Sequence, residues 1–180
     1  MKPITITALF VCISLANLYS QDLINNFKLD ENKLIYWQSV IETDLSIEQL
    51  NCLIIESGHF IQIERFEDKT ICVLKPFKAN YQAYGYSTMK APFYISRTLI
   101  EGNVIFEFRE NRYRVTVKNI VFRQNTPDIF SALNEVETFE SWVLNKNQEL
   151  KPAFFKDGSD ILNNEFMLKT KLVNIQSEAW

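Results

Sequence analysis

The stretch that decides the fold is VIFEFRENRYRVTVK, which runs from residue 104 to residue 118. Apolar and polar residues alternate along both of its halves, as is typical of two strands that each bury one face. An even-length turn at residues 110–111 predicts an antiparallel hairpin, with Asn111 taking the positive φ. The register predicts four opposite pairs: Phe108 with Tyr113, Phe106 with Val115, Val104 with Val117, and Glu107 with Arg114. One face of the hairpin is therefore apolar, and the other is charged.

A strand and a capped helix are expected upstream of this hairpin. Residues 33–43 alternate loosely and are rich in β-branched and aromatic types, which predicts a strand. The apolar positions on one side of it are Ile35, Trp37 and Ile41. Ser46 and Gln49 have the spacing of a capping box, which predicts a helix over residues 47–57. Gly58 supplies the left-handed residue that ends this helix.

Three more segments complete the expected sheet. Residues 60–66 and 69–75 read as a hairpin joined by a two-residue turn. That turn sets Ile61 opposite Leu74 and Ile63 opposite Cys72. Residues 92–100 read as a further strand, joined to the decisive hairpin by a tight turn at residues 101–102. A three-stranded meander over residues 92–122 follows from this reading.

Two helical segments are expected toward the C-terminal end. Thr126 as N-cap, followed by a proline, begins a helix that ends near Asn145. Its apolar stripe consists of Ile129, Leu133, Val136, Phe139 and Val143. From Ser159 onward the pattern fits a helix to about residue 173, or a strand over residues 167–175.

This order of elements predicts an α+β protein. Strands joined by short turns form an antiparallel sheet, and amphipathic helices need one of its faces to cover. We therefore expect a two-layer sandwich of about six strands with helices on one face. The expected division is a signal peptide (1–20), an N-terminal lead-in (21–32), the α+β domain (33–145) and a C-terminal extension, helical and packed on that domain (146–180).

Composition excludes several kinds of chemistry. The 180 residues are 47% apolar and carry a formal charge of −3, which is typical of one globular domain. Only four glycines and one histidine, His59, are present. A glycine-rich phosphate loop and a metal site with several imidazoles are therefore excluded, and any serine or cysteine nucleophile would depend on His59 as its base. We expect no catalytic residue, no cofactor and no metal.

Residues 1–20 have the pattern of a secretory signal peptide. One charge, Lys2, precedes an apolar run over residues 4–18, which is shorter than the roughly 20 residues that span a bilayer. Cleavage is expected after Ser20, with Ala16 as the alternative position. Cleavage after Ser20 leaves a chain with a formal charge of −4 and no transmembrane segment. A periplasmic or extracellular location follows. An exported acidic chain without a basic cluster is a poor ligand for nucleic acid.

Two cysteines remain after cleavage, Cys52 on the expected helix and Cys72 on an expected strand. The exported compartment permits a disulfide between them. Cysteine is equally a common buried apolar residue, so the sequence leaves their pairing open.

The second strand of the hairpin, residues 112–120 (RYRVTVKNI), carries a family resemblance. With the signal peptide and the capped helix, it resembles a family of secreted bacterial domains of unknown function whose fold is similar to that of the TATA-box-binding protein (TBP). The family has Asp-Gly-Arg at the turn where this chain has Glu110-Asn111-Arg112, and the likeness covers residues 33–145. The resemblance implies a TBP-like architecture and no activity. It does not imply DNA binding, because function belongs to sites rather than folds.

Two groups of residues are candidates for a partner-binding surface. The connection over residues 77–94 is rich in aromatic residues, and three tyrosines surround Gly85: Tyr81, Tyr84 and Tyr86. They either form a contact patch or fold back over the exposed face of the sheet. Three cations share the charged face of the hairpin: Arg112, Arg114 and Lys118. They either receive an anion or an acidic partner, or form a solvated, ion-paired sheet face.

The function that these observations favour is an exported, non-catalytic binding module for an unknown protein or small ligand of the cell envelope. Two alternatives remain open. A carrier of a small apolar ligand needs a cavity between sheet and helices. A hydrolase needs a site that no sequence pattern reveals.

Overall fold

The structure of the protein is a computed structural model, which describes residues 21–125 and 135–173. Its strands are β1 (Gln21–Ile24), β2 (Phe27–Leu29), β3 (Ile35–Glu42), β4 (Phe60–Arg65), β5 (Lys69–Phe77), β6 (Thr98–Arg109), β7 (Arg112–Gln124) and β8 (Val136–Thr138). Its helices are α1 (Ile47–Glu56), α2 (Phe93–Arg97), α3 (Phe139–Val143) and α4 (Ser159–Thr170), with a 3₁₀ turn, η1 (Tyr81–Tyr84), and a π-helical turn, η2 (Phe154–Gly158).

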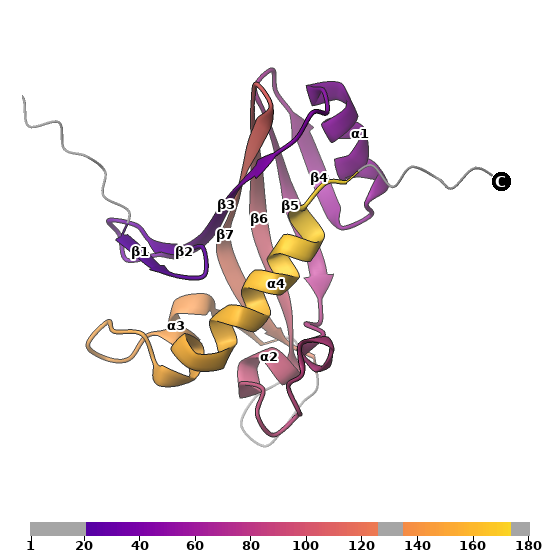
Figure 1. Cartoon of the computed structure of the whole chain (residues 1–180). Helices are drawn as coiled ribbons and strands as arrows, with labels where there is room; N and C mark the ends of the chain where they lie inside the picture. The colour runs from indigo at the N-terminus through magenta and orange to yellow at the C-terminus, as the bar shows by residue number, and fades with distance from the viewer. Residues whose placement is uncertain (1–20, 126–134, 174–180) are drawn as a thin grey trace, which may run out of the picture.

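The strands form one antiparallel sheet in the order β1-β2-β3-β7-β6-β5-β4, and β8 pairs with β7. Helix α4 crosses one face of this sheet diagonally (Figure 1). The two-layer α+β prediction is therefore confirmed. The described residues form eight strands rather than about six. Strands β1 and β2 lie in the expected lead-in and β8 lies in a segment expected to be helical, whereas two of the expected strands are joined in β6.

The decisive hairpin has the predicted register. Phe106 lies opposite Val115 and Glu107 opposite Arg114, and Asn111 takes a φ of 57° in the turn. Strand β3 pairs with the other edge of β7, so Trp37 lies opposite Val117. The apolar face of these three strands is buried: Trp37, Phe106, Tyr113, Val115 and Val117 are each 0% exposed.

Helix α1 begins and ends where the sequence predicts. The capping box is present, with the Ser46 amide donating to Gln49 Oε1 at 2.8 Å and the Gln49 amide donating to Ser46 Oγ at 3.3 Å. Gly58, just past the helix, has a φ of 66°. Thr70 Oγ1 of β5 donates to Asn51 Oδ1 of α1 at 2.6 Å, and both residues are buried. This hydrogen bond joins the helix to the sheet.

The predicted register of β4 and β5 is confirmed next to the turn, where Glu64 lies opposite Ile71, but it is wrong by one residue beyond that point. Phe60 lies opposite Leu74 and Ile61 opposite Val73. The pairing is irregular between Ile61 and Glu64, where Gln62 takes a φ of 51°. This bulge breaks the simple alternation on which the prediction depended, and it leaves Ile61 on the exposed side.

The predicted strand at residues 92–100 is confirmed only for residues 98–100, and the predicted turn at residues 101–102 is wrong. Residues 93–97 form α2, and β6 then continues without a turn from Thr98 to Arg109. The pairing with β7 is irregular at Gly102, where an added Cβ would lie 3.0 Å from Val117 Cγ1 and 3.2 Å from the Lys118 carbonyl oxygen. Gly102 therefore serves close packing of two strands rather than a turn.

The predicted helix over residues 127–145 is wrong in the part that the structure describes. Thr126 and Pro127 lie outside the described residues. Val136 belongs to β8, which pairs with residues 121–123 of β7, and it is exposed rather than part of an apolar stripe. Only residues 139–143 are helical. Pairing with β7 prevails over the helical spacing of the apolar residues.

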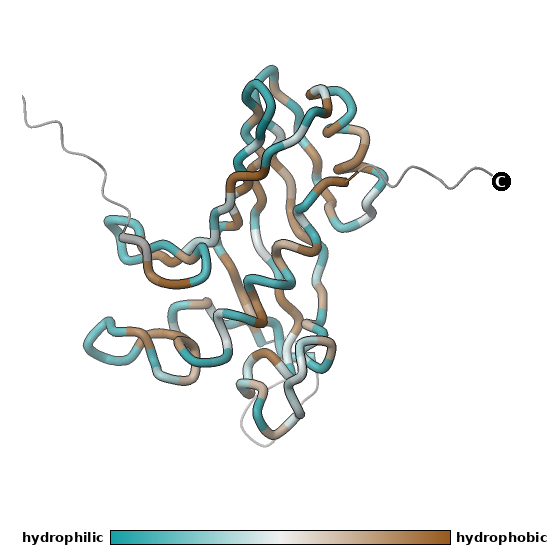
Figure 2. Tube along the Cα trace, viewed as in Figure 1, coloured by the Kyte–Doolittle hydropathy of each residue, from teal (hydrophilic) through white to brown (hydrophobic). Residues whose placement is uncertain are grey.

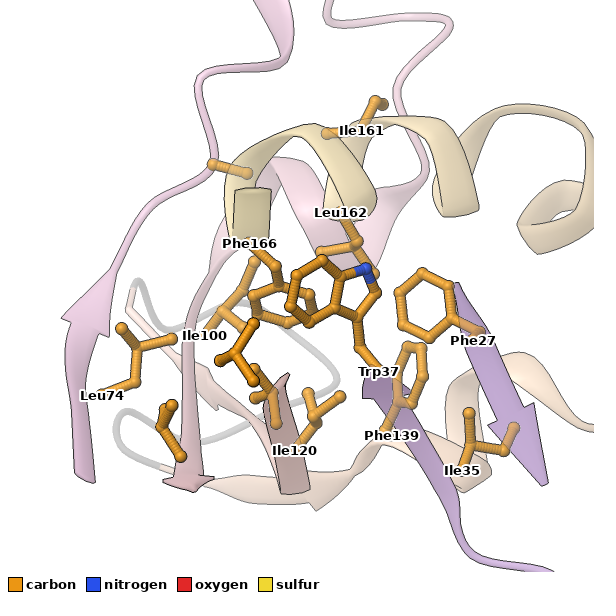
Figure 3. Close-up of a cluster of buried hydrophobic side chains, with 14 of the residues drawn as sticks. Phe27, Ile35, Trp37, Leu74, Ile100, Ile120, Phe139, Ile161, Leu162 and Phe166 are labelled. Carbon is orange, nitrogen blue, oxygen red and sulfur yellow. The ribbon is translucent and has the colours of Figure 1, made fainter. Parts of the chain in front are cut away.

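The segment after Ser159 is a helix, so the alternative of a strand over residues 167–175 is wrong for its described part. Helix α4 packs on the sheet through Leu162 and Phe166, which are 0% exposed. The Trp37 and Phe166 ring centroids lie 5.6 Å apart, beside a cluster that includes Phe27 and Phe139 (Figure 3). Hydrophobic residues recur along the central strands and α4 (Figure 2).

Tyr113 fixes the C-terminal end of α4 to the sheet. Its hydroxyl donates to the Thr170 carbonyl oxygen at 3.0 Å and accepts from the Leu172 amide at 2.8 Å. Burial raises the pKa of Tyr113 to about 12. The hydroxyl satisfies backbone groups that the helix end leaves without partners within the helix.

Candidate binding face

The face of the sheet turned away from α4 carries side chains of β3, β7, β6 and β5 in aligned rows. We call this the open face. Cross-strand neighbours define a middle row of Ile71, Ile105, Thr116 and Gln38. A second row consists of Lys69, Glu107, Arg114 and Val40, and a third contains Val73, Asn103 and Lys118, with Tyr36 beside Lys118. Residues two apart on a strand point to the same side, so the three rows share one surface.

The middle row carries no charge. Gln38 Nε2 donates to Thr116 Oγ1 at 3.0 Å, and Thr116 is only 2% exposed although it lies on the open face. Ile71 and Ile105 lie opposite each other and are half-buried. This row is therefore the floor of the open face, and the longer side chains of the neighbouring rows partly cover it.

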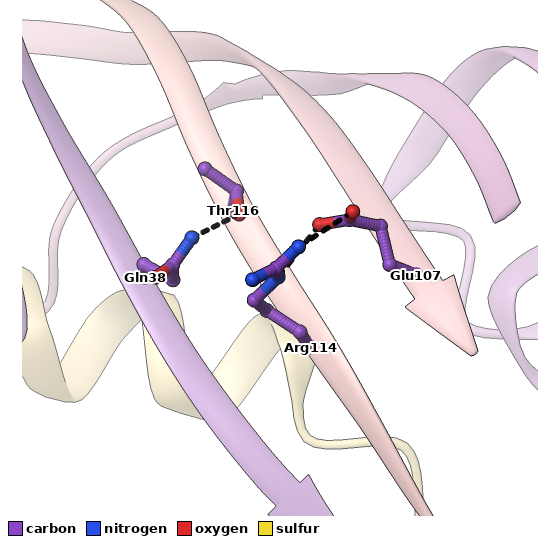
Figure 4. A network of polar contacts seen from close by, with 4 residues as sticks. All are labelled: Gln38, Glu107, Arg114 and Thr116. Atoms are coloured by element: carbon purple, nitrogen blue, oxygen red, sulfur yellow. Dashed lines mark hydrogen bonds and ion pairs between the residues drawn. The ribbon is translucent and has the colours of Figure 1, made fainter. Parts of the chain in front are cut away.

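An ion pair dominates the second row (Figure 4). Arg114 Nε donates to Glu107 Oε2 at 2.8 Å, and Arg114 Nη2 donates to Glu107 Oε1 at 2.7 Å. Both partners are more than a third exposed, so the pair contributes little to stability. The hydrogen bonds from Arg114 lower the pKa of Glu107, and the charges of Arg109 and Lys118 act in the same direction.

The third row places a cation over an aromatic ring. Lys118 Nζ lies 5.4 Å from the centroid of the Tyr36 ring, which is within the range of a cation–π interaction. Lys118 is exposed and Tyr36 is half-buried.

A hollow of about 400 Å³ lies over these rows. Its lining consists of Asp30, Glu31, Tyr36, Gln38, Lys69, Ile71, Ile105, Glu107, Arg114, Thr116 and Lys118. A smaller hollow of about 90 Å³ lies toward the hairpin turn, lined by Val40, Glu107, Arg109, Arg112 and Arg114. Apolar and uncharged floor residues with charged flanks are suited to a ligand that presents both kinds of group.

The structure does not bring the two predicted groups of residues together. Arg112, Arg114 and Lys118 are exposed on the open face, as their alternation predicts. The alternative that the tyrosines fold back over the exposed face of the sheet is wrong, because Tyr84 contacts α4 on the covered side: its hydroxyl donates to Glu165 Oε1 at 3.3 Å.

Glu165 explains the position of the tyrosine segment. This carboxylate is 2% exposed and also accepts from the Asn80 amide at 2.8 Å, so it holds η1 against α4. Tyr81 is buried, and its hydroxyl lies 3.3 Å from Thr88 Oγ1. Burial and the charge of Glu165 raise the pKa of Tyr84 to about 12. Tyr86 is half-buried, and its pKa is raised by burial and by two aspartates of the η2–α4 segment.

His59 and the two cysteines lie away from the open face. His59 follows α1, and its pKa is lowered by partial burial and by the charges of Lys169 and Lys75. Cys52 is exposed and Cys72 is buried, and both are free thiols. Burial raises the pKa of Cys72 to about 12, so its thiol stays protonated near neutral pH. In the described part of the chain, no group of three or more His, Cys, Asp or Glu side chains is placed to hold a metal ion.

The sequence reasoning missed most of the floor of the open face. Gln38, Ile71, Ile105 and Thr116 were not singled out. Two signals were available: Gln38 follows the inward-facing Trp37, and Thr116 lies between the inward-facing Val115 and Val117. The alternation of each strand thus assigns these side chains to the open face, but the pairing of β5 with β6 and of β3 with β7 is needed to align them in one row.

Comparisons with known proteins give two structural similarities. A crystal structure of a TBP-like protein from Parabacteroides distasonis is similar to 84% of this chain and 95% of its own, with a TM-score of 0.47 and 10% identity. A crystal structure of a DUF4468 family protein from Bacteroides ovatus is similar to 84% of this chain and 88% of its own, with a TM-score of 0.46 and 11% identity. No family model and no curated protein matches the chain. The fold class stated above depends on the described strands and helices themselves.

Proposed function

We propose that this protein is a binding module without catalytic activity, and that its open face receives the partner. The observation that carries the proposal is the hollow of about 400 Å³, which four adjacent strands build from an uncharged floor between charged rows. An antiparallel sheet commonly leaves one face in water, and such a face needs only charged and polar side chains to be solvated. This floor differs from such a surface because Thr116 is buried and two isoleucines lie opposite each other.

The covered side supports the same proposal. Side chains such as Trp37 and Phe166 fill the space between the sheet and α4. A carrier of apolar ligands needs that space to be open, so this packing favours the open face over the interior as the binding site. For a hydrolase, a catalytic histidine is oriented by an acid, whereas the charges that act on the pKa of His59 are those of Lys169 and Lys75.

The proposal includes export. It depends on the charged start and the apolar run of residues 1–20, which lie outside the described part of the chain. Among the described residues, no helix combines the length and hydropathy needed to span a bilayer. Because the proposal includes export, it places the partner in the cell envelope.

Photo-crosslinking in the cells that produce the protein tests the proposal. A photoreactive amino acid replaces Ile105 on the open face or, as the matched control, Leu168, which is 67% exposed on α4. We expect a discrete adduct from position 105 that position 168 does not give. The same adducts from both positions, or none from position 105, would contradict the open face as the binding surface.

A further inference from the structure

We propose that Arg109 and Arg112, here called the arginine pair, bind a carboxylate of an extended acidic peptide that lies along the open face. The proposal deepens the function proposed above and depends on it. The arginine pair lies at the hairpin end of the open face and lines the hollow of about 90 Å³ with Arg114, Glu107 and Val40.

The fold places Arg109 and Arg112 next to each other at the end of the hairpin. Arg109 and Arg112 are directly opposite partners across the β6–β7 hairpin, and both are exposed. Like charges directly opposite each other destabilise a strand pair, unless an anion lies between them. Figure 2 shows this turn as a hydrophilic tip of the sheet. A bound anion would therefore reduce the repulsion between the two arginines.

The nearby acids that the structure describes do not form ion pairs with the arginine pair. Both carboxylate oxygens of Glu107 accept from Arg114. Glu42 lies opposite Arg112 on β3, but among the described residues neither arginine of the pair takes part in an ion pair. The hollow beside them thus has three arginines and one acid that is already engaged.

The size and chemistry of the hollow fit a carboxylate. One water needs about 10–15 Å³ of cavity, so about 90 Å³ holds a group of several heavy atoms. A guanidinium presents paired donors that match the two oxygens of a carboxylate. The neighbouring Arg114–Glu107 pair has this two-bond geometry on the same face.

The rest of the open face extends the site along β7. Arg112 and Lys118 lie six residues apart on one side of that strand, which corresponds to about 20 Å. Across the two hollows, five cations face three acids. The uncharged floor lies between the arginine pair and Lys118. An extended peptide of about six residues spans this distance, with acidic side chains toward both cationic ends.

The test is the affinity of the purified chain for a fluorescent octaglutamate peptide, measured by anisotropy. The Arg109→Gln/Arg112→Gln variant is compared with Lys90→Gln/Lys156→Gln, which removes the same net charge from exposed lysines outside the two hollows. We expect at least a tenfold loss of affinity for the arginine variant and less than a twofold loss for the lysine variant. Octaglutamine is expected not to bind. Inorganic phosphate at the same charge concentration is expected to compete weakly.

Equal losses in the two variants would overturn the proposal, because they would mean attraction by net charge alone. Unchanged affinity in the arginine variant, or no binding by the unmodified chain, would overturn it as well. Phosphate that displaces the peptide as well as free glutamate peptide does would assign the pair to inorganic anions instead. If crosslinking from position 105 still identifies a partner in those cases, only the acidic peptide is refuted and the binding function stands. Thermal melts of both variants verify that each remains folded.

Discussion

Replacing Gly158 by alanine is expected to destabilise the protein although it lies in a helical conformation, with φ −67° and ψ −38°. At such a position alanine is usually favoured over glycine by about 1 kcal/mol. Here an added Cβ lies far inside van der Waals contact with the Tyr94 hydroxyl oxygen. It also lies 3.3 Å from Phe154 Cδ2 and 3.4 Å from the Ala153 carbonyl oxygen. The approach of Tyr94 of α2 is therefore what requires glycine.

The expected magnitude follows from these two opposing effects. Overpacking a closed site costs about 1–3 kcal/mol, and the helical preference for alanine offsets part of this. We expect Gly158→Ala to lower the free energy of unfolding by up to about 2 kcal/mol. The Tyr94 hydroxyl is buried and has no hydrogen-bond partner among residues 21–125 and 135–173, so Tyr94→Phe removes the clashing atom at little cost. In the Tyr94→Phe background, alanine at position 158 is expected to be neutral or stabilising.

Urea unfolding of the four proteins of this double-mutant cycle measures the coupling, which is expected to be about 1–3 kcal/mol. The slope of free energy against urea should be the same for all four, so that the midpoints report stability. Equal destabilisation by Gly158→Ala in both backgrounds would refute the contact with Tyr94. Stabilisation by Gly158→Ala in the unmodified chain would refute it too.

Three further outcomes are expected. Phe106→Ala removes a fully buried ring and should cost about 3–5 kcal/mol in urea melts, whereas Arg114→Ala should cost under about 1 kcal/mol; the reverse order would mean that the hairpin register is wrong. Tyr113→Phe leaves two backbone groups at the end of α4 without a partner and should cost about 1–3 kcal/mol by the same assay, and a cost near zero would mean that water replaces the hydroxyl. The pKa of His59 is lowered in the folded protein, so the unfolded chain binds the imidazole proton more readily and stability should fall as pH drops below the ordinary histidine range. The His59→Gln variant should show a smaller fall between pH 7 and 5. Identical pH profiles of the two proteins would contradict this.

Local alternation predicted the parts of the fold in which each strand keeps a regular pleat. Trp37 and Phe106 lie inward because they occupy the apolar side of strands whose residues largely alternate between apolar and polar types, and one turn sets the register of the hairpin. The capping box and Gly58 likewise act within a few residues. Such features need no knowledge of distant contacts, so the sequence reveals them directly.

The failures have a common physical cause, which is a contact between distant segments. Gln62 and Gly102 lie where the pairing with a neighbouring strand becomes irregular. The local sequence at neither position distinguishes a bulge from a turn. Val136 has helical spacing but pairs with β7. In the candidate site, the cations of the open face follow from alternation. The position of Tyr84 depends on Glu165, 81 residues further along the chain.

The measurement that most directly tests the open face as the binding surface is the affinity of the crosslinked partner, once purified, for two single variants. Ile105→Lys changes the floor of the hollow, and Leu168→Lys makes the same chemical change on the exposed side of α4. Titration calorimetry is expected to give at least a tenfold weaker affinity for Ile105→Lys and an affinity within twofold of the unmodified chain for Leu168→Lys, with both variants folded. Equal affinities of the unmodified chain and Ile105→Lys, or a larger loss in Leu168→Lys, would contradict binding at the open face.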